Sequence, residues 1–141
     1  MLAFVTRDFI FSVKPKYAER IMDGTKTVEL RRRFGNDDAV GAHAFIYASS
    51  PAKEMVGFAV IDDVRKLPLS QIWELYGPQA CITRREFDDY FSGVDEGYAI
   101  VLKRAQRLKI ATTIHELRKR FGFSAPQSYR YASAEYHALI S

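Results

Sequence analysis

The chain has 141 residues, 48% hydrophobic and 27% charged, which is typical of one compact domain with a core of its own. Its formal charge of +4 favours anionic partners, although 17 acidic residues interrupt the positive charge along the chain. The one cysteine excludes an internal disulfide and no segment is apolar for long enough to span a membrane, so we expect residues 1–141 to form one domain in a reducing, cytoplasmic setting.

The chain begins with the pattern of a strand followed by a helix. Residues 8–13 alternate in the manner of a strand that is buried on one or both faces. Pro15 suits the first position of a helix, and Gly24 is a natural left-handed stop. We therefore expect a short helix over 15–23, flanked at its start by Lys14 and Lys16, which are interpreted as solvated surface lysines.

After the helix, apolar and polar residues alternate with the two-residue period of a strand. Val28 and Leu30 share one face of the first of these strands, and its other face is entirely polar, with Thr27, Glu29, Arg31 and Arg33. Residues 35–38 have the composition of a turn. Residues 44–48 and 56–64 are rich in β-branched and aromatic side chains and predict two further strands.

The middle of the chain changes to helical spacing. A helix over 69–76 is predicted to end at Gly77-Pro78, because proline cannot continue it. Residues 83–86 have the sequence of a capping box, which opens a second helix that stops near Gly93. Its apolar residues, Tyr90 among them, are expected in the core.

The last third is predicted to add a strand, a helix and an irregular tail. Residues 98–103 alternate as a strand, and a second capping box at 113–116 opens a helix through about Phe121. Residues 124–131 are interpreted as a loop, and the segment 133–140 as a last helix capped by its serine. Early strands with helices between later ones favour an α+β domain, in which short helices cover a curled sheet.

The segment after the first helix resembles the ASCH domain family, relatives of the PUA fold. That family's motif, G-x-K-x-x-E-x-R, is matched at Gly24, Lys26, Glu29 and Arg31, and most of the remaining chain is also similar to the family. The resemblance implies a PUA-like mixed β-barrel of about five to six strands flanked by short helices. It also implies a cleft beside the motif that holds RNA or a nucleotide-like ligand, and in some members a hydrolytic activity.

The motif residues have a compatible physical interpretation. Glu29 and Arg31 lie two residues apart on one strand face, close enough for an ion pair that leaves guanidinium donors free for phosphate. In a regular strand the Lys26 side chain would point to the opposite face from Glu29 and Arg31. It can lie beside them only because it sits at the junction between the helix and the strand, where the alternation is broken. The alternative is a solvated sheet face, on which Arg33 pairs with a neighbouring aspartate.

Two other segments supply candidate ligand-binding residues. Tyr47, Ser49 and Ser50 end a strand beside a proline, where side chains and amides can meet a phosphate or a base edge, or simply cap a loop. A second candidate set interleaves an aromatic side chain with a cation, and consists of Ser128, Tyr129 and Arg130. Such a combination suits stacking on unpaired bases, although tyrosines that pack against the last helix are the alternative.

Three functional hypotheses follow. A binding module would hold RNA in a basic cleft, with an affinity that weakens as salt rises. An enzyme would use Lys26 and Glu29 as a general acid and base on RNA or on a modified nucleoside. An ASCH subgroup that removes acyl groups from modified cytidine has a threonine nucleophile where this chain has Glu29, which argues against that activity. A regulatory domain that acts through a protein partner is the third hypothesis.

The sequence contains few indications of a metal ion, an organic cofactor or an oligomeric state. The three histidines, His43, His115 and His137, are far apart in the sequence and show no zinc-ligand spacing. No metal and no organic cofactor is indicated, although a nuclease that uses hydrated magnesium would need few dedicated ligands. The sequence does not determine the oligomeric state.

Overall fold

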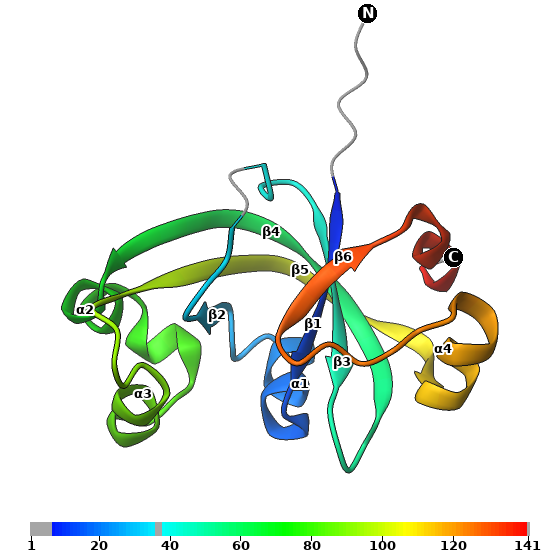
Figure 1. Ribbon diagram of the computed structural model, residues 1–141, viewed down its shortest axis with the longest axis horizontal. Coiled ribbons are helices and arrows are strands. Elements are labelled where there is room, and N and C mark those ends of the chain that lie inside the picture. The colour runs from blue at the N-terminus through cyan, green and yellow to red at the C-terminus, as the bar shows by residue number, and fades with distance from the viewer. Residues whose placement is uncertain (1–6, 36–37, 141) are drawn as a thin grey trace, which may run out of the picture.

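The computed structural model describes residues 7–35 and 38–140, and its strands form one mixed sheet in the order β2-β5-β4-β3-β1-β6 (Figure 1). The strands are β1 (Asp8–Val13), β2 (Val28–Arg31), β3 (His43–Ala48), β4 (Glu54–Pro68), β5 (Glu96–Thr113) and β6 (Tyr129–Ala132). Strands β1 and β3 are parallel, and every other neighbouring pair is antiparallel.

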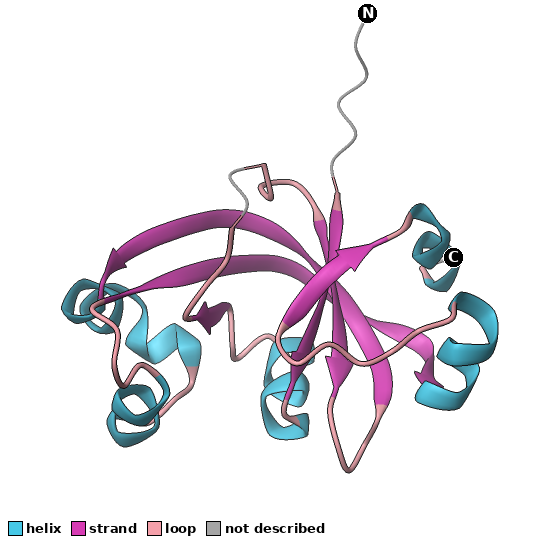
Figure 2. Cartoon of the chain, in the orientation of Figure 1, coloured by secondary structure: helices cyan, strands magenta, loops and turns pink. Residues whose placement is uncertain are grey.

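Short helices cover this sheet and its two ends (Figure 2). They are α1 (Pro15–Met22), α2 (Leu69–Ala80), α3 (Arg84–Tyr90), α4 (Ile114–Phe121) and the 3-10 helix η1 (Ala134–Leu139). Helices α2 and α3 lie at one end of the long strands β4 and β5, whereas α4 and η1 lie at the other end (Figure 1). The expected α+β, PUA-like fold is confirmed. The sheet is not a closed barrel, because β2 and β6 are each hydrogen-bonded to one neighbour only.

Both faces of the central strands are buried. On β1, Phe9 and Phe11 point into a first core that includes the apolar face of α1, whereas Ile10 points into a second core with Leu117 of α4 and Tyr136 of η1. This alternation is the period of two that a strand imposes on its side chains. A third core packs α2 and α3 on β2 and on the adjoining end of β5.

The two longest strands bend at bulges. The register between β4 and β5 shifts at three places, and Arg104 within β5 has a left-handed φ of 54°. At Gly57 the strands approach so closely that a Cβ atom would lie 2.4 Å from the backbone oxygen of Gln106 and 2.2 Å from the sulfur of Met22. The bulges and this glycine give the sheet its curl.

Three predicted elements differ from the structure. Helix α2 does not end at Gly77-Pro78 but runs to Ala80, because Gly77 has no Cβ to clash with the proline ring and Pro78 lies in the last turn. The predicted strand over 98–103 is only part of β5, since the bulges break the alternation that the prediction followed. The predicted loop over 124–131 is wrong at Tyr129–Ala132, which pair with β1 as β6.

Other elements lie where the sequence predicts them, although the strand predicted over 56–64 extends over Glu54–Pro68 as β4. Thr83 and Glu86 form the reciprocal capping box of α3, and the Thr113 side chain accepts a hydrogen bond from the Glu116 backbone at the start of α4. The last helix is a 3-10 helix rather than an α-helix. Of the turn expected at 35–38, two residues lie outside the described part. Among the described residues no helix is both long and apolar enough to cross a membrane.

Candidate functional site

A cleft with a volume of about 920 Å³ opens beside the motif strand β2. Its walls come from the start of α1, from β2, from the end of β3 and the turn after it, from α3, from α4 and from residues 125–127. These segments lie far apart in the sequence, and the curl of the sheet brings them together (Figure 1). A volume of this size is typical of a site for a small ligand or a few nucleotide units.

Three charged residues of the motif form the floor of the cleft. Lys26, Glu29 and Arg31 are exposed by only 4%, 8% and 7%. Glu29 lies between the two cations, with Oε2 at 2.6 Å from Arg31 Nη2 and Oε1 at 3.4 Å from Lys26 Nζ. The predicted ion pair between Glu29 and Arg31 is therefore present, and it is buried rather than part of a solvated face.

The ammonium of Lys26 is surrounded by acceptors from the protein itself. It donates to the backbone oxygens of Ala80, at 2.6 Å, and of Val28, at 2.9 Å, and its third interaction is with Glu29. An ammonium has three protons to donate. All three are occupied, so Lys26 fixes the junction between α1 and β2 against the end of α2.

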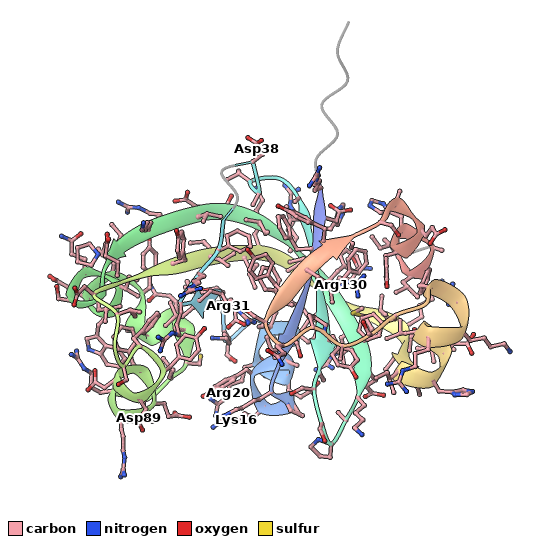
Figure 3. All side chains as sticks on the ribbon, in the orientation of Figure 1. Lys16, Arg20, Arg31, Asp38, Asp89 and Arg130 are labelled. Atoms are coloured by element: carbon pink, nitrogen blue, oxygen red, sulfur yellow. The ribbon has the colours of Figure 1, made fainter. Side chains whose placement is uncertain are left out.

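The guanidinium of Arg31 is equally occupied. Nη1 donates to the hydroxyl oxygen of Ser128 at 3.0 Å and to its backbone oxygen at 3.3 Å, and Nη2 donates to Glu29 and to the backbone oxygen of Ser12. Only Nε is left as a buried side-chain atom without a partner among the described residues. The donors on the two terminal nitrogens, which were expected to be free for a phosphate, are thus already committed to the protein. Figure 3 shows Arg31 at strand β2.

The electrostatics of the floor keep Glu29 ionised. Burial alone would raise the pKa of its carboxyl group, but the neighbouring charges of Arg31 and then Lys26 outweigh burial and hold the pKa below its usual value. A carboxylate in this state accepts hydrogen bonds firmly and takes up a proton poorly. The trio is therefore a rigid structural base for the cleft.

Three exposed cations line the cleft above this floor. Lys14 precedes α1, Lys53 ends the turn between β3 and β4, and Arg118 lies on α4. All three are exposed, and among the described residues no side-chain hydrogen bond or ion pair engages any of them. Lys53 has a left-handed φ of 51°, which is costly for a lysine and is found most often at functional sites.

Sequence reasoning missed two of these cations. Lys14 was interpreted as a solvated surface lysine; it is exposed, and it also lines the cleft. Lys53 and Arg118 belong to a turn and to a helix that only the tertiary fold places beside the motif. Neither residue stands at a characteristic sequence distance from β2, so the sequence contains no local signal that marks Lys53 or Arg118 as part of the cleft.

The predicted residues at the end of β3 also line the cleft. The ring of Tyr47 is buried, yet its hydroxyl makes no hydrogen bond with a described residue. Burial raises the pKa of this hydroxyl, and the charge of Arg118 acts in the opposite direction. Ser49 and Ser50 are partly and fully exposed in the turn that follows. Together they supply hydroxyl groups that can donate to an anionic ligand.

The remaining predicted residues lie outside the lining of the cleft. Arg33 is exposed just beyond β2, and Ser128 supports Arg31 from behind. Tyr129 is partly buried and packs its ring against Phe34, with ring centroids 4.9 Å apart, at the edge of the first core. Arg130 lies on β6 (Figure 3) and bonds to Ser124.

One rim of the cleft is aromatic and acidic. Tyr17 donates its hydroxyl proton to Glu86 at 2.7 Å, and Lys16 bonds to the same oxygen at 3.0 Å. The bond from Tyr17, helped by the backbone of Thr83, lowers the pKa of Glu86 far below its usual range. Tyr90 was expected in the core, but it is 37% exposed and lines the cleft. Tyr17 and Tyr90 are aromatic side chains that a base could contact.

Comparison with known proteins gives consistent similarities. Residues 6–131 match the family described as a domain of unknown function, DUF365. The chain is 31% identical over 130 residues to an ASCH domain-containing ribonuclease of Zymomonas mobilis, which covers 92% of this chain and 86% of that protein. The crystal structure of ASCH from Zymomonas mobilis superposes with a TM-score of 0.89 at 28% identity, over 96% of this chain and 94% of the other.

A more distant structure shares the fold. Human THYN1, solved in complex with DNA that contains 5-methylcytosine, matches with a TM-score of 0.53 and 15% identity, over 95% of each chain. At this identity the similarity concerns the fold alone. The overall fold of this chain is therefore found in other proteins.

Proposed function

This chain belongs to the ASCH domain family, and on that premise we propose that it binds single-stranded RNA in the cleft beside β2. The observation that carries the proposal is the set of exposed cations that line the cleft, Lys14, Lys53 and Arg118, above a floor that is held rigid by buried ion pairs. Cations without protein partners are the groups that a phosphate backbone would engage.

The shape and lining of the cleft favour a single strand. A volume of about 920 Å³ suits a few nucleotide units, whereas a duplex is recognised across an extended surface. Unpaired bases stack on aromatic rings, and Tyr17 and Tyr90 lie in the lining. The similarity to a relative named as a ribonuclease supports RNA as the polymer.

The motif residues have an indirect role in this proposal. Lys26 and Arg31 direct their donors to protein oxygens rather than into the cleft. Arg31 holds Ser128, and thereby holds the preceding residues 125–127 in place as one wall. The charged residues that match the family motif would then build the cleft, while the phosphate contacts come from other residues.

Fluorescence anisotropy of a labelled single-stranded RNA tests the proposal. The double variant Lys53→Ala/Arg118→Ala removes two cations of the lining, and we expect its affinity to fall by at least tenfold at moderate salt. The control Lys109→Ala/Arg104→Ala removes the same charge from exposed positions outside the cleft lining. Equal losses in both variants would show that RNA is attracted by net charge alone, and the cleft proposal would then fail.

A second candidate function is ribonuclease activity, favoured by the name of the 31% identical relative. In one route of RNA cleavage a general base takes the proton of the ribose 2′ hydroxyl, and the 2′ oxygen bonds to the adjacent phosphorus to form a 2′,3′-cyclic phosphate. The bond from phosphorus to the 5′ oxygen breaks as a general acid gives that oxygen a proton. Lys26 and Glu29 are poorly placed as the acid and base, because their protons and lone pairs are engaged within the protein. The Tyr47 hydroxyl and the Lys53 ammonium line the cleft without such partners.

Gel analysis of the same labelled RNA separates the two functions. If the chain cleaves RNA through this cleft, Tyr47→Phe should reduce the cleavage rate by about 100-fold or more while binding is retained, since a general acid or base contributes about that much. Binding with intact RNA in the wild type would leave the binding module as the function. Cleavage that is unaffected by Tyr47→Phe and by Lys53→Ala would exclude this assignment of the reacting groups.

A further inference from the structure

We propose that Asp8, His43 and His137 form a binding site for a divalent transition-metal ion such as Zn²⁺. Their potential ligand atoms all lie within 4.8 Å of one another. Asp8 begins β1, His43 begins β3, and His137 comes from η1. The site is independent of the proposed RNA cleft, because it lies four residues, or about 13 Å, back along β1 and β3 from Ser12 and Tyr47.

The separations within the trio suit ligands of one metal ion. His43 Nδ1 lies 3.6 Å from Asp8 Oδ1, which is too long for a hydrogen bond. Two ligand atoms on a tetrahedral zinc ion are about 3.3 Å apart, given metal–ligand bonds of about 2.0 Å. The other pair, His137 Nε2 and Asp8 Oδ2, is 2.5 Å apart, so the two histidines approach different oxygens of one carboxylate. To bind a single ion, His137 would move back by about 0.8 Å and the carboxylate would turn so that it meets the ion between the two rings.

The surroundings contact all three ligands and limit their movement. The backbone N–H of His43 donates to Asp8 Oδ1 at 2.9 Å, which fixes the orientation of the carboxylate. The His43 ring lies against Phe58 with ring centroids 5.7 Å apart, and the His137 ring packs edge-on to Phe45 at 6.3 Å. The hydrogen bond to Asp8 is the kind of supporting contact that orients a metal ligand and increases affinity, and the ring contacts limit the rotation of the two imidazoles.

The chemistry of the ligands selects the class of ion. Two imidazoles and one carboxylate suit zinc and its neighbours in the first transition row, whereas magnesium and calcium prefer oxygen ligands only. Asp8 is 9% exposed, but the side chains of His43 and His137 are 31% and 50% exposed, so an ion can enter from solvent. Three protein ligands leave at least one coordination position for water.

Metal binding here would fasten η1 to the sheet. His137 is the one ligand that comes from outside β1 and β3, and it belongs to the last described helix. An ion that binds all three groups binds only the folded arrangement, and it therefore stabilises the fold by mass action. We expect Zn²⁺ to raise the thermal midpoint of the wild type and to have little effect on that of His137→Ala.

Titration with Co²⁺, read by its visible absorption, tests the site directly. The chain, freed of any affinity tag and treated with a chelator, should bind one equivalent of Co²⁺ and release it to Zn²⁺. Loss of a direct ligand should weaken binding at least as much as loss of a supporting contact, so His137→Ala and His43→Ala should each weaken it by about tenfold or more. His115→Ala is the matched control, because His115 is exposed on α4, outside the trio.

Each outcome bears on the proposal. One equivalent of Co²⁺ lost in the two histidine variants and retained in His115→Ala would support it, and unchanged RNA binding in His137→Ala would show that the two sites are separate. Absence of saturable binding in the wild type would overturn it and would leave Asp8 and His137 as a hydrogen-bonded pair. Binding that is equally weakened by His115→Ala, or that is lost in Cys81→Ser, would also overturn it.

Discussion

Arg31 and Ser128 are bonded across the opening of the sheet. Arg31 is the last residue of edge strand β2, and Ser128, 97 residues later, directly precedes the opposite edge strand β6. The guanidinium donates to both the hydroxyl and the backbone oxygen of Ser128. No strand pairing joins the two edge strands, so the sheet stays open between them. The Arg31 side chain connects β2 to the residue that precedes β6.

Arg31→Lys should destabilise the chain although it preserves the charge. A lysine ammonium cannot reproduce the planar fork, so at least one of the oxygens of Ser12 and Ser128 would lose its partner. We expect a loss of about 1–3 kcal/mol in the free energy of unfolding for such a buried unsatisfied group. Urea denaturation measures it. Arg33→Lys, at an exposed position, is the control and should change stability by less than about 0.5 kcal/mol.

Glu29 should contribute to acid sensitivity. Its pKa in the folded chain is below its usual value of 4.5, so between these two values the unfolded chain binds more protons and acidification favours unfolding. The stability that Glu29 supplies is thus complete above about pH 4.5 and is lost as the pH falls through the lower value. Stability measured against pH should decrease in this window.

Glu29→Gln separates this contribution from those of other carboxylates. We expect the variant to be less stable than the wild type at neutral pH by about 3–5 kcal/mol, because two buried cations lose their counter-ion. Its stability should also depend less on pH below 4.5. Glu19→Gln removes an exposed partner of Arg107 and serves as the comparison, with a small effect at neutral pH. An unchanged acid profile in Glu29→Gln would contradict the assignment.

Gly57 should tolerate no side chain. A methyl group there would meet the backbone oxygen of Gln106 at 2.4 Å, and backbone cannot rotate away as a side chain can. Gly57→Ala should therefore destabilise the chain by about 1–3 kcal/mol or more, the usual cost of overpacking. Gly35→Ala, where no atom lies within 4 Å of the added carbon, should be nearly neutral. Thermal unfolding of both variants checks the contrast.

The salt dependence of RNA binding should identify how many phosphates the cleft cations contact. For a single strand the logarithm of the affinity falls with the logarithm of salt concentration by about 0.7 per neutralised phosphate. Lys53→Ala/Arg118→Ala should therefore reduce the slope by about 1.4 relative to the wild type. Anisotropy titrations at four or more salt concentrations give the slope. A slope equal to that of the wild type would mean that neither cation contacts a phosphate.

The sequence was sufficient for local features and for the motif. The strand at 8–13, the helix from Pro15 and the capping box at Thr83 follow from nearest-neighbour chemistry, and the structure confirms them. At Thr113 only the bond from the Glu116 backbone to the Thr113 side chain is present. The pairing of Glu29 with Arg31 followed from strand parity. The fold class followed from the resemblance to ASCH domains, which the family match confirms.

Features that depend on distant parts of the chain could not be predicted in this way. Strand β6 forms because β1 offers it an edge, and nothing within Tyr129–Ala132 distinguishes it from a loop. Arg31 donates to Ser128, a residue far away in the sequence. The cleft is lined by Lys53 and Arg118, and only the fold brings these two cations together. The trio of Asp8, His43 and His137 is hidden for the same reason.

The partnership of the first strand with the last has a consequence for synthesis. β1 pairs with β6, and its aromatic residues Phe9 and Phe11 face rings supplied by Tyr129 and Tyr131. During synthesis, the aromatic edge of β1 therefore stays unpaired until residues 129–132 have left the ribosome. An unpaired strand edge can pair with other chains, so slow translation between β1 and β6 should favour aggregation, and chaperones should bind the emerging chain at β1.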